Sequence, residues 1–155
     1  MLFRSITAEE MDDVEGIEQI AGVAAFLAAL PPHRWAVVTS APRALALRRI
    51  AAAGLPTPPL LVAAEDVTQG KPAPDCFVLA ATRLGVDARD CLVFEDAPAG
   101  IAAAEAAGAG VVVITATHAR THAHVPATAH AHAGDYARLG VRADAHAWRV
   151  VDRDA

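Results

Sequence analysis

Short apolar runs alternate along this chain with longer segments that have helical spacing. Four short, continuously apolar runs predict buried parallel strands, at residues 35–38, 60–63, 91–94 and 110–114. Helical patterns lie before and between them, at residues 20–30, 42–53, 74–84 and 98–107. Gly54, Gly85 and Gly108 follow the last three helical patterns, and Pro31-Pro32 stops the first. Strands that alternate with helices in this way predict an α/β fold with a parallel sheet.

The two ends of the chain have weaker patterns. Residues 6–19 are acidic and compatible with a helix, whereas residues 116–134 are rich in Ala, His and Thr and have little periodicity. A last apolar piece, at 148–151, is compatible with a short edge strand. The chain therefore divides into a leading segment, a core, and a His/Ala-rich loop with a C-terminal tail, at residues 1–19, 20–115 and 116–155.

Composition and charge narrow the range of partners. Hydrophobic residues make up 54% of the chain and charged residues 20%, which is typical of a globular protein. The net charge is −5 and no basic cluster extends beyond Arg48-Arg49, which argues against nucleic acid as a partner. No apolar run reaches membrane-spanning length. Cys76 and Cys91 lack Cys-x-x-Cys spacing, so we expect two buried, reduced thiols in a cytoplasmic protein.

Polar residues suited to catalysis or ligand binding follow three of the predicted strands. Thr39 and Ser40 close the first strand, and Glu95 and Asp96 close the third. Lys71 lies in the loop after the second strand and is the only lysine, since the other twelve basic residues are arginines. Because ligands bind at the carboxyl edge of an open parallel sheet, we expect these residues to meet there.

These residue types suit phosphate chemistry with a divalent metal. Thr39 offers a hydroxyl where a helix opens, and the backbone N–H groups that follow form a phosphate cradle. Lys71 is a compact point charge that can neutralise a phosphoryl oxygen. Asp96 suits direct coordination of Mg²⁺, with Glu95 beside it directly or through water. The metal would polarise the phosphoryl group.

The order of these groups, spelled KPAPD at 71–75 and FEDAPAGI at 94–101, resembles the haloacid dehalogenase superfamily. Within it the chain is similar to the sugar-phosphate phosphatases and the related β-phosphoglucomutases, from about Ile20 to Ile114. The resemblance implies a doubly wound parallel sheet with a Rossmann-like core. It also implies Mg²⁺-dependent hydrolysis of a small phosphorylated metabolite, a sugar or polyol phosphate, through an aspartyl-phosphate intermediate.

The resemblance carries roles to individual residues. It implies that Thr39 and Lys71 are catalytic and phosphate-binding, with Ser40 beside them, and that Asp96 and Glu95 hold the metal. Arg43 lies one helical turn beyond Thr39, where relatives contact the distal part of the substrate.

One family motif is missing from this sequence. Members use an aspartate nucleophile in an N-terminal Asp-x-Asp-Gly-Thr motif, after a first strand and before a helical cap; neither Asp12-Asp13 nor the acidic residues at 152–154 have that context. In the family sheet this first strand lies between the strands that end at Thr39 and Phe94. We therefore expect a core that lacks its central first strand and most of the cap, and a chain that is inactive alone. The two edges facing the gap would expose unpaired backbone groups, which is too costly to sustain. We therefore expect that the two strand pairs close together, that another segment fills the gap, or that the chain needs its absent segment.

The first residues suggest an origin for this gap. Leu2-Phe3-Arg4-Ser5 can be encoded by the end of a common sequencing adapter. We hypothesise a truncated reading frame in which residues 1–5 are artefactual and residues 6–19 are the tail of a cap.

Several alternatives stay open at this point. Glu95-Asp96 on its own could be an acidic pair that complements a helix dipole, and Thr39-Ser40 could be an N-cap. A phosphosugar mutase fragment is a second enzymatic reading, and a non-catalytic module that binds a phosphorylated ligand or a metal is a third. The five histidines between His118 and His132 fit either a polar loop or a zinc or nickel site.

Overall fold

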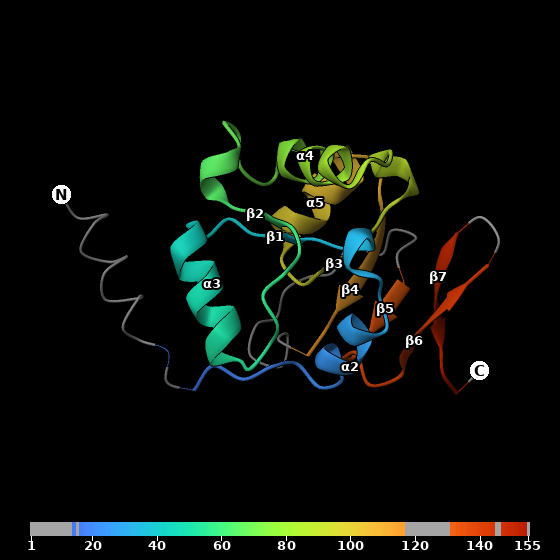
Figure 1. Cartoon of the computed structure of the whole chain (residues 1–155). Coiled ribbons are helices and arrows are strands. Elements are labelled where there is room, and N and C mark those ends of the chain that lie inside the picture. Colours follow the sequence, from blue (N-terminus) through green and yellow to red (C-terminus); the bar gives the residue numbers. More distant parts are fainter. Residues whose placement is uncertain (1–13, 15, 117–130, 145–146, 155) are drawn as a thin grey trace.

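The strands in the described part of the chain form three separate sheets (Figure 1). The computed structural model describes residues 14, 16–116, 131–144 and 147–154. The first sheet pairs β1 (Val37–Val38) with β2 (Leu61–Val62), and the second holds β3 (Leu92–Glu95), β4 (Gly110–Ile114) and β5 (Ala131–Ala133), all parallel. The third is an antiparallel hairpin of β6 (Leu139–Ala143) and β7 (Trp148–Asp152). The predicted α/β class with parallel strands is therefore confirmed.

Among the described residues, four α-helices accompany these strands: α2 (Val23–Ala28), α3 (Arg43–Ala52), α4 (Asp75–Leu84) and α5 (Pro98–Ala106). Each lies inside the range that the sequence predicts. The helix α4 ends at Gly85, whose backbone φ of 74° places it in the left-handed region that favours glycine. In Figure 1, α4 and α5 lie side by side above the strands, and α3 lies at the side of β1 and β2. No helix in the described ranges is both long and apolar enough to cross a membrane.

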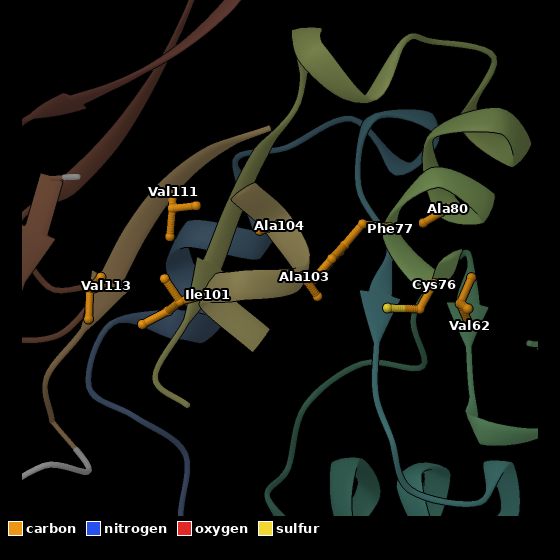
Figure 2. Packing of buried hydrophobic residues seen from close by; sticks show 9 residues of the cluster. All are labelled: Val62, Cys76, Phe77, Ala80, Ile101, Ala103, Ala104, Val111 and Val113. Atoms are coloured by element: carbon orange, nitrogen blue, oxygen red, sulfur yellow. The ribbon is translucent and has the colours of Figure 1, made fainter. Parts of the chain in front are cut away.

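One hydrophobic cluster joins the two parallel sheets through α4 and α5 (Figure 2). Its buried members come from β2, β4 and the two helices: Val62, Cys76, Phe77, Ala80, Ile101, Ala103, Ala104, Val111 and Val113. Phe77 of α4 and Ala103 of α5 lie between the β2 side and the β4 side of the cluster. The alanines on α5 allow this close approach of the two helices. The core is therefore continuous although the sheets are not.

The gap between the two parallel sheets leaves two strand edges without a strand partner among the described residues. The N–H groups of Val37 and Thr39 donate to the carbonyls of Leu60 and Val62, so the backbone groups of Val38 point to the other side of β1. Cys91 accepts a hydrogen bond from Gly110 of β4, so the backbone groups of Leu92 and Phe94 point away from β4. Among the described residues, β1–β2 and β3–β4 therefore lie in separate sheets and do not close onto each other, and β5 adds a third strand to the second sheet.

An aromatic cluster attaches α2 to the second sheet. The Phe26 ring, which is 2% exposed, lies 5.3 Å from the Phe94 ring on β3 and 5.4 Å from the Tyr136 ring, measured between centroids. The Phe94 and Tyr136 rings are 5.6 Å apart. The Tyr136 N–H also donates to the Ala21 carbonyl at 2.9 Å. The segment that follows β5 is thereby fixed beside the carboxyl end of β3.

The C-terminal part contains more strand than the sequence indicates. β5 pairs with β4 and extends the second sheet, although it falls in the region assigned to a loop and tail. Its Ala-His-Ala sequence has no β-branched or large apolar residue, so no strand pattern is visible. The apolar piece at 148–151 does form a strand, but as half of the β6–β7 hairpin. Cys76 is buried, whereas Cys91 is only half-buried, and both are free thiols.

Candidate functional site

Lys71 and the polar residues at the end of β1 surround one small cavity. The cavity has a volume of about 80 Å³ and is lined by Thr39, Ser40 and Lys71, with Gly70, Ala64, Val67 and Cys76 completing its wall. Thr39 and Ser40 reach it because they directly follow β1, and Lys71 reaches it from the loop between β2 and α4. The structure thus brings together three of the site residues that the sequence singles out.

Lys71 connects the two parallel sheets. Its ammonium forms an ion pair with the Glu95 carboxylate at the end of β3, and the two side chains are only 12% and 10% exposed. The same Nζ donates to the Val38 carbonyl on β1 at 3.5 Å, a long hydrogen bond to an edge that has no described strand partner. The Nζ also lies 4.9 Å from the centroid of the Phe77 ring. One lysine therefore contacts β1, β3 and α4.

The Glu95 carboxylate is held by its own loop as well as by Lys71. Its Oε2 accepts hydrogen bonds from the N–H groups of Asp96 and Ala97 at 3.0 and 3.2 Å, while Oε1 faces Lys71. Both oxygens thus have donors within the protein. The sequence predicts Glu95 at the metal, whereas the pairing of Glu95 with Lys71 was not predicted.

The start of α3 differs from the phosphate cradle that the sequence suggests. The Ala41 N–H donates to Thr39 Oγ1 at 3.1 Å. The Arg43 N–H donates to both carboxylate oxygens of Glu65, each at 3.1 Å. Two of the N–H groups expected to face a phosphate therefore already have acceptors. The remaining contacts for an anion here are the side chains of Thr39, Ser40 and Lys71.

Arg43 does not line the cavity, because residues in and after β2 hold its side chain. Its guanidinium donates to the Leu61 carbonyl at 3.3 Å and forms an ion pair with Asp66. The Asp66 carboxylate also accepts from the Ala63 N–H at 2.8 Å and from Arg83 at 3.3 Å. The Ala63 hydrogen bond, with the two guanidinium groups, lowers the pKa of Asp66. Glu65 and Asp66 were missed in the sequence, although an acidic pair that follows a strand is the same signal as Glu95-Asp96.

A second cavity lies on the other side of Glu95. It has a volume of about 120 Å³ and is lined by Glu95, Asp96 and Tyr136, together with Ile20, Phe94 and Ile114. Burial, followed by the negative charges of Asp96 and Glu95, raises the pKa of Tyr136 to about 12. The sequence gives no signal for Tyr136, because it approaches from beyond β5 and carries no motif.

The donor set at this edge fits Mg²⁺ in its chemistry. Asp96 and Glu95 are neighbouring carboxylates, and Mg²⁺ binds to one or two carboxylates with water and phosphate oxygens completing the shell. Among the described residues no group of three or more His, Cys, Asp or Glu side chains could hold a metal ion by itself. Both Glu95 oxygens already accept hydrogen bonds, so Glu95 suits a supporting place beside a metal.

Some residues considered in the sequence lie outside the described ranges. These include Asp12-Asp13 and all the histidines of the C-terminal tract except His132. His132 is an exposed residue of β5.

Comparison with known proteins gives one consistent family. A family model described as a haloacid dehalogenase-like hydrolase matches residues 3–108, starting well before the resemblance at Ile20. Hexitol phosphatase A of Escherichia coli is 44% identical over 101 residues, which cover 64% of this chain and 47% of that protein. Glycerol-1-phosphate phosphohydrolase 2 of Saccharomyces cerevisiae is 43% identical over 89 residues, covering 53% of this chain and 36% of that protein. The chain spans less than half the length of either relative.

The fold is also similar to that of two solved protein structures. CbbY from Rhodobacter sphaeroides, in complex with phosphate, superposes with a TM-score of 0.67 at 26% identity and covers 78% of this chain and 56% of that chain. A haloacid dehalogenase (HAD) family hydrolase from Deinococcus radiodurans, with bound phosphate and sodium, superposes with a TM-score of 0.57 at 31% identity. The match covers 63% of this chain and 44% of that chain.

Proposed function

The chain belongs to the haloacid dehalogenase-like hydrolases, and from this premise we propose that it is part of a Mg²⁺-dependent phosphatase for a small phosphorylated sugar or polyol. The observation that carries the proposal is the position of Lys71, which lines a cavity with Thr39 and also contacts Glu95 beside Asp96. The names of the relatives support the substrate class, since hexitol phosphatase A and glycerol-1-phosphate phosphohydrolase 2 are both named for polyol phosphates.

In this proposal the first cavity binds the phosphoryl group. Thr39 Oγ1 accepts a hydrogen bond from the Ala41 N–H, so the hydroxyl proton of Thr39 is directed to a phosphoryl oxygen. The Lys71 ammonium has three N–H donors, of which Glu95 and the Val38 carbonyl take two. The third donates to the phosphoryl group, and the exposed Ser40 adds a second hydroxyl.

The acidic pair next to this cavity would hold Mg²⁺. We assign direct coordination to Asp96 and a supporting place, directly or through water, to Glu95. When bound, the metal supplies polarisation of the phosphoryl group and offsets its negative charge. Glu95 keeps Lys71 at the boundary between the phosphate and the metal.

We further propose that the 155-residue chain does not turn over substrate by itself. In the family that it resembles, an aspartate of an Asp-x-Asp-Gly-Thr motif attacks phosphorus and forms an aspartyl-phosphate. The sequence contains no such motif. The residues of this chain would therefore bind and orient the phosphoryl group, while the attacking carboxylate belongs to a part of the protein that these residues do not include.

The experiment is calorimetric titration of the purified chain with inorganic phosphate and with a hexitol phosphate, each with and without Mg²⁺. We expect weak phosphate binding that requires Mg²⁺, that is lost in Lys71→Met and Thr39→Val, and that persists in Arg142→Met, a charge-matched control on the exposed hairpin. Absence of binding by the folded chain would contradict the site. Phosphatase turnover that Lys71→Ala abolishes would contradict the proposed inactivity.

A second candidate is a non-catalytic module that binds a phosphorylated ligand. The retained binding groups without the nucleophile motif favour it. The same titration separates the two readings, because a dedicated binding module should bind its ligand with a dissociation constant of about 1 μM or lower, near −8 kcal/mol. A core that needs a further segment should bind much more weakly.

A further inference from the structure

Gly100 is an unexpected residue at its position in α5. It is the only glycine inside an α-helix in the part of the chain that the structure describes. The helix otherwise consists almost entirely of alanine, with the sequence PAGIAAAEA. Glycine is the least favourable helix residue apart from proline, and alanine is the most favourable. The backbone φ of Gly100 does not lie in the left-handed region, so conformation gives no reason for glycine here.

The reason lies in the space where a side chain would begin. A Cβ atom built on Gly100 would lie within 2.5 Å of all three carboxylate atoms of Glu95, Cδ, Oε1 and Oε2. Real Cβ atoms do not approach other heavy atoms this closely. The Glu95 carboxylate therefore occupies the volume that any other amino acid at position 100 would fill.

Glu95 cannot move aside without losing its partners. Its side chain is 10% exposed, and its carboxylate pairs with Lys71 and accepts hydrogen bonds from the N–H groups of Asp96 and Ala97. A Cβ at position 100 would push the carboxylate out of this arrangement. The Lys71 ammonium would then keep only the long hydrogen bond to Val38 and the contact with the Phe77 ring.

We propose that Gly100 is a positioning residue: it gives the Glu95 carboxylate its place over the first turn of α5, and through Glu95 it fixes the Lys71 ammonium at the edge of the phosphate cavity. The geometric part of this proposal is independent of the proposed function, whereas its consequence for phosphate binding rests on it. Position 100 is glycine and not the helix-favouring alanine because the Glu95 carboxylate occupies the space of a Cβ atom there.

The experiment is a double-mutant cycle between Gly100→Ala and Glu95→Ala in the full chain. Gly100→Ala alone should lower the denaturant midpoint, because it expels a carboxylate that has buried partners. In the Glu95→Ala background the same substitution should leave the midpoint unchanged or raise it, because only the helix preference of alanine remains. Gly134→Ala is the matched control, since nothing lies within 4 Å of its Cβ position and its φ is not left-handed.

The second measurement reports on Lys71 directly. Lys71 is the only lysine, so acylation by an amine-reactive reagent, located by mass spectrometry, gives one side-chain signal. We expect several-fold faster acylation of Lys71 in Gly100→Ala and in Glu95→Ala, no further increase in the double variant, and no change in Gly134→Ala. If Gly100→Ala unfolds the chain, the double variant still decides the outcome, because it should fold and match Glu95→Ala.

The outcomes distinguish the positioning role from the proposed function. Equal losses of stability from Gly100→Ala with and without Glu95, or unchanged Lys71 acylation in a folded Gly100→Ala chain, would overturn the positioning role. If the cycle and the acylation behave as expected but the wild-type chain binds no phosphate with Mg²⁺, the positioning role stands and the proposed function fails.

Discussion

Replacing Lys71 by methionine should destabilise the protein and loosen the connection between its two parallel sheets. Methionine keeps the unbranched stem that packs in the same space, so the substitution removes mainly the ammonium. Three contacts of the Nζ are lost: the ion pair with Glu95, the 3.5 Å hydrogen bond to Val38, and the approach to the Phe77 ring. Each of these contacts leads to a different element.

The magnitude follows from the burial of the pair. Exposed ion pairs contribute about 0–1 kcal/mol, whereas removal of one partner from a fully buried pair costs about 3–5 kcal/mol. Lys71 and Glu95, at 12% and 10% exposure, lie near the buried limit. Glu95 keeps two backbone N–H donors after the substitution, which reduces its penalty. We expect a loss of about 2–3 kcal/mol, a large part of a domain stability of about 5–15 kcal/mol.

The assay is urea unfolding of wild type and Lys71→Met, followed by tryptophan fluorescence. The loss should change little with salt, because ions do not screen a pair this enclosed. Lys71→Met combined with Glu95→Gln should lose less than the sum of the two single variants. A loss within about 0.5 kcal/mol, the range of ordinary surface substitutions, would refute the reasoning that Lys71 links the sheets.

Three further predictions concern other parts of the molecule. Phe26→Ala should cost about 3–5 kcal/mol in unfolding experiments, because a buried ring leaves the aromatic cluster; a loss below about 1 kcal/mol would contradict that packing. Tyr136 is the only tyrosine, so tyrosinate absorbance should titrate near pH 12 in the folded chain. Because the pKa of Tyr136 is raised, its protonated form contributes to the stability of the folded state. This contribution to the free energy of unfolding is complete below the unfolded pKa of about 10 and is lost as pH rises towards 12. A tyrosinate titration midpoint at the unfolded pKa would argue against burial of Tyr136. Asp66 has a lowered pKa, so it stabilises the fold above its unfolded pKa and this contribution disappears as pH falls through the folded value. Asp66→Asn should therefore flatten the acid side of the stability profile, and an unchanged profile would exclude the network with Arg43.

The sequence was sufficient for most of the core. Buried parallel strands are short apolar runs, and glycine or proline marks the ends of the helices, so every predicted core strand and helix occurs within one or two residues of its predicted bounds or inside them. Thr39, Lys71 and Glu95 were expected at one edge because each follows a strand, and the first two share a cavity. These features depend on local pattern, which one sequence contains.

Features that depend on contacts between distant segments were not visible. The partner of Arg43 is Asp66, 23 residues away, and nothing in the spacing indicates that the pair forms. β5 was missed because Ala-His-Ala gains its strand conformation from pairing with β4 and not from its own preference. Gly100 is one residue of the FEDAPAGI motif in the sequence, and its role appears only in the fold, where the Glu95 carboxylate occupies the place of a Cβ.

The side of β3 that has no strand partner in the described part of the chain has a consequence in concentrated solution. The backbone groups of Leu92 and Phe94 face away from β4, and the Leu92 side chain is 43% exposed. An apolar strand whose donors and acceptors point away from its sheet is a template on which an extended peptide, including the same strand of another molecule, can add. We expect the isolated chain to aggregate more readily as its concentration rises, unless a peptide that fits this edge is supplied.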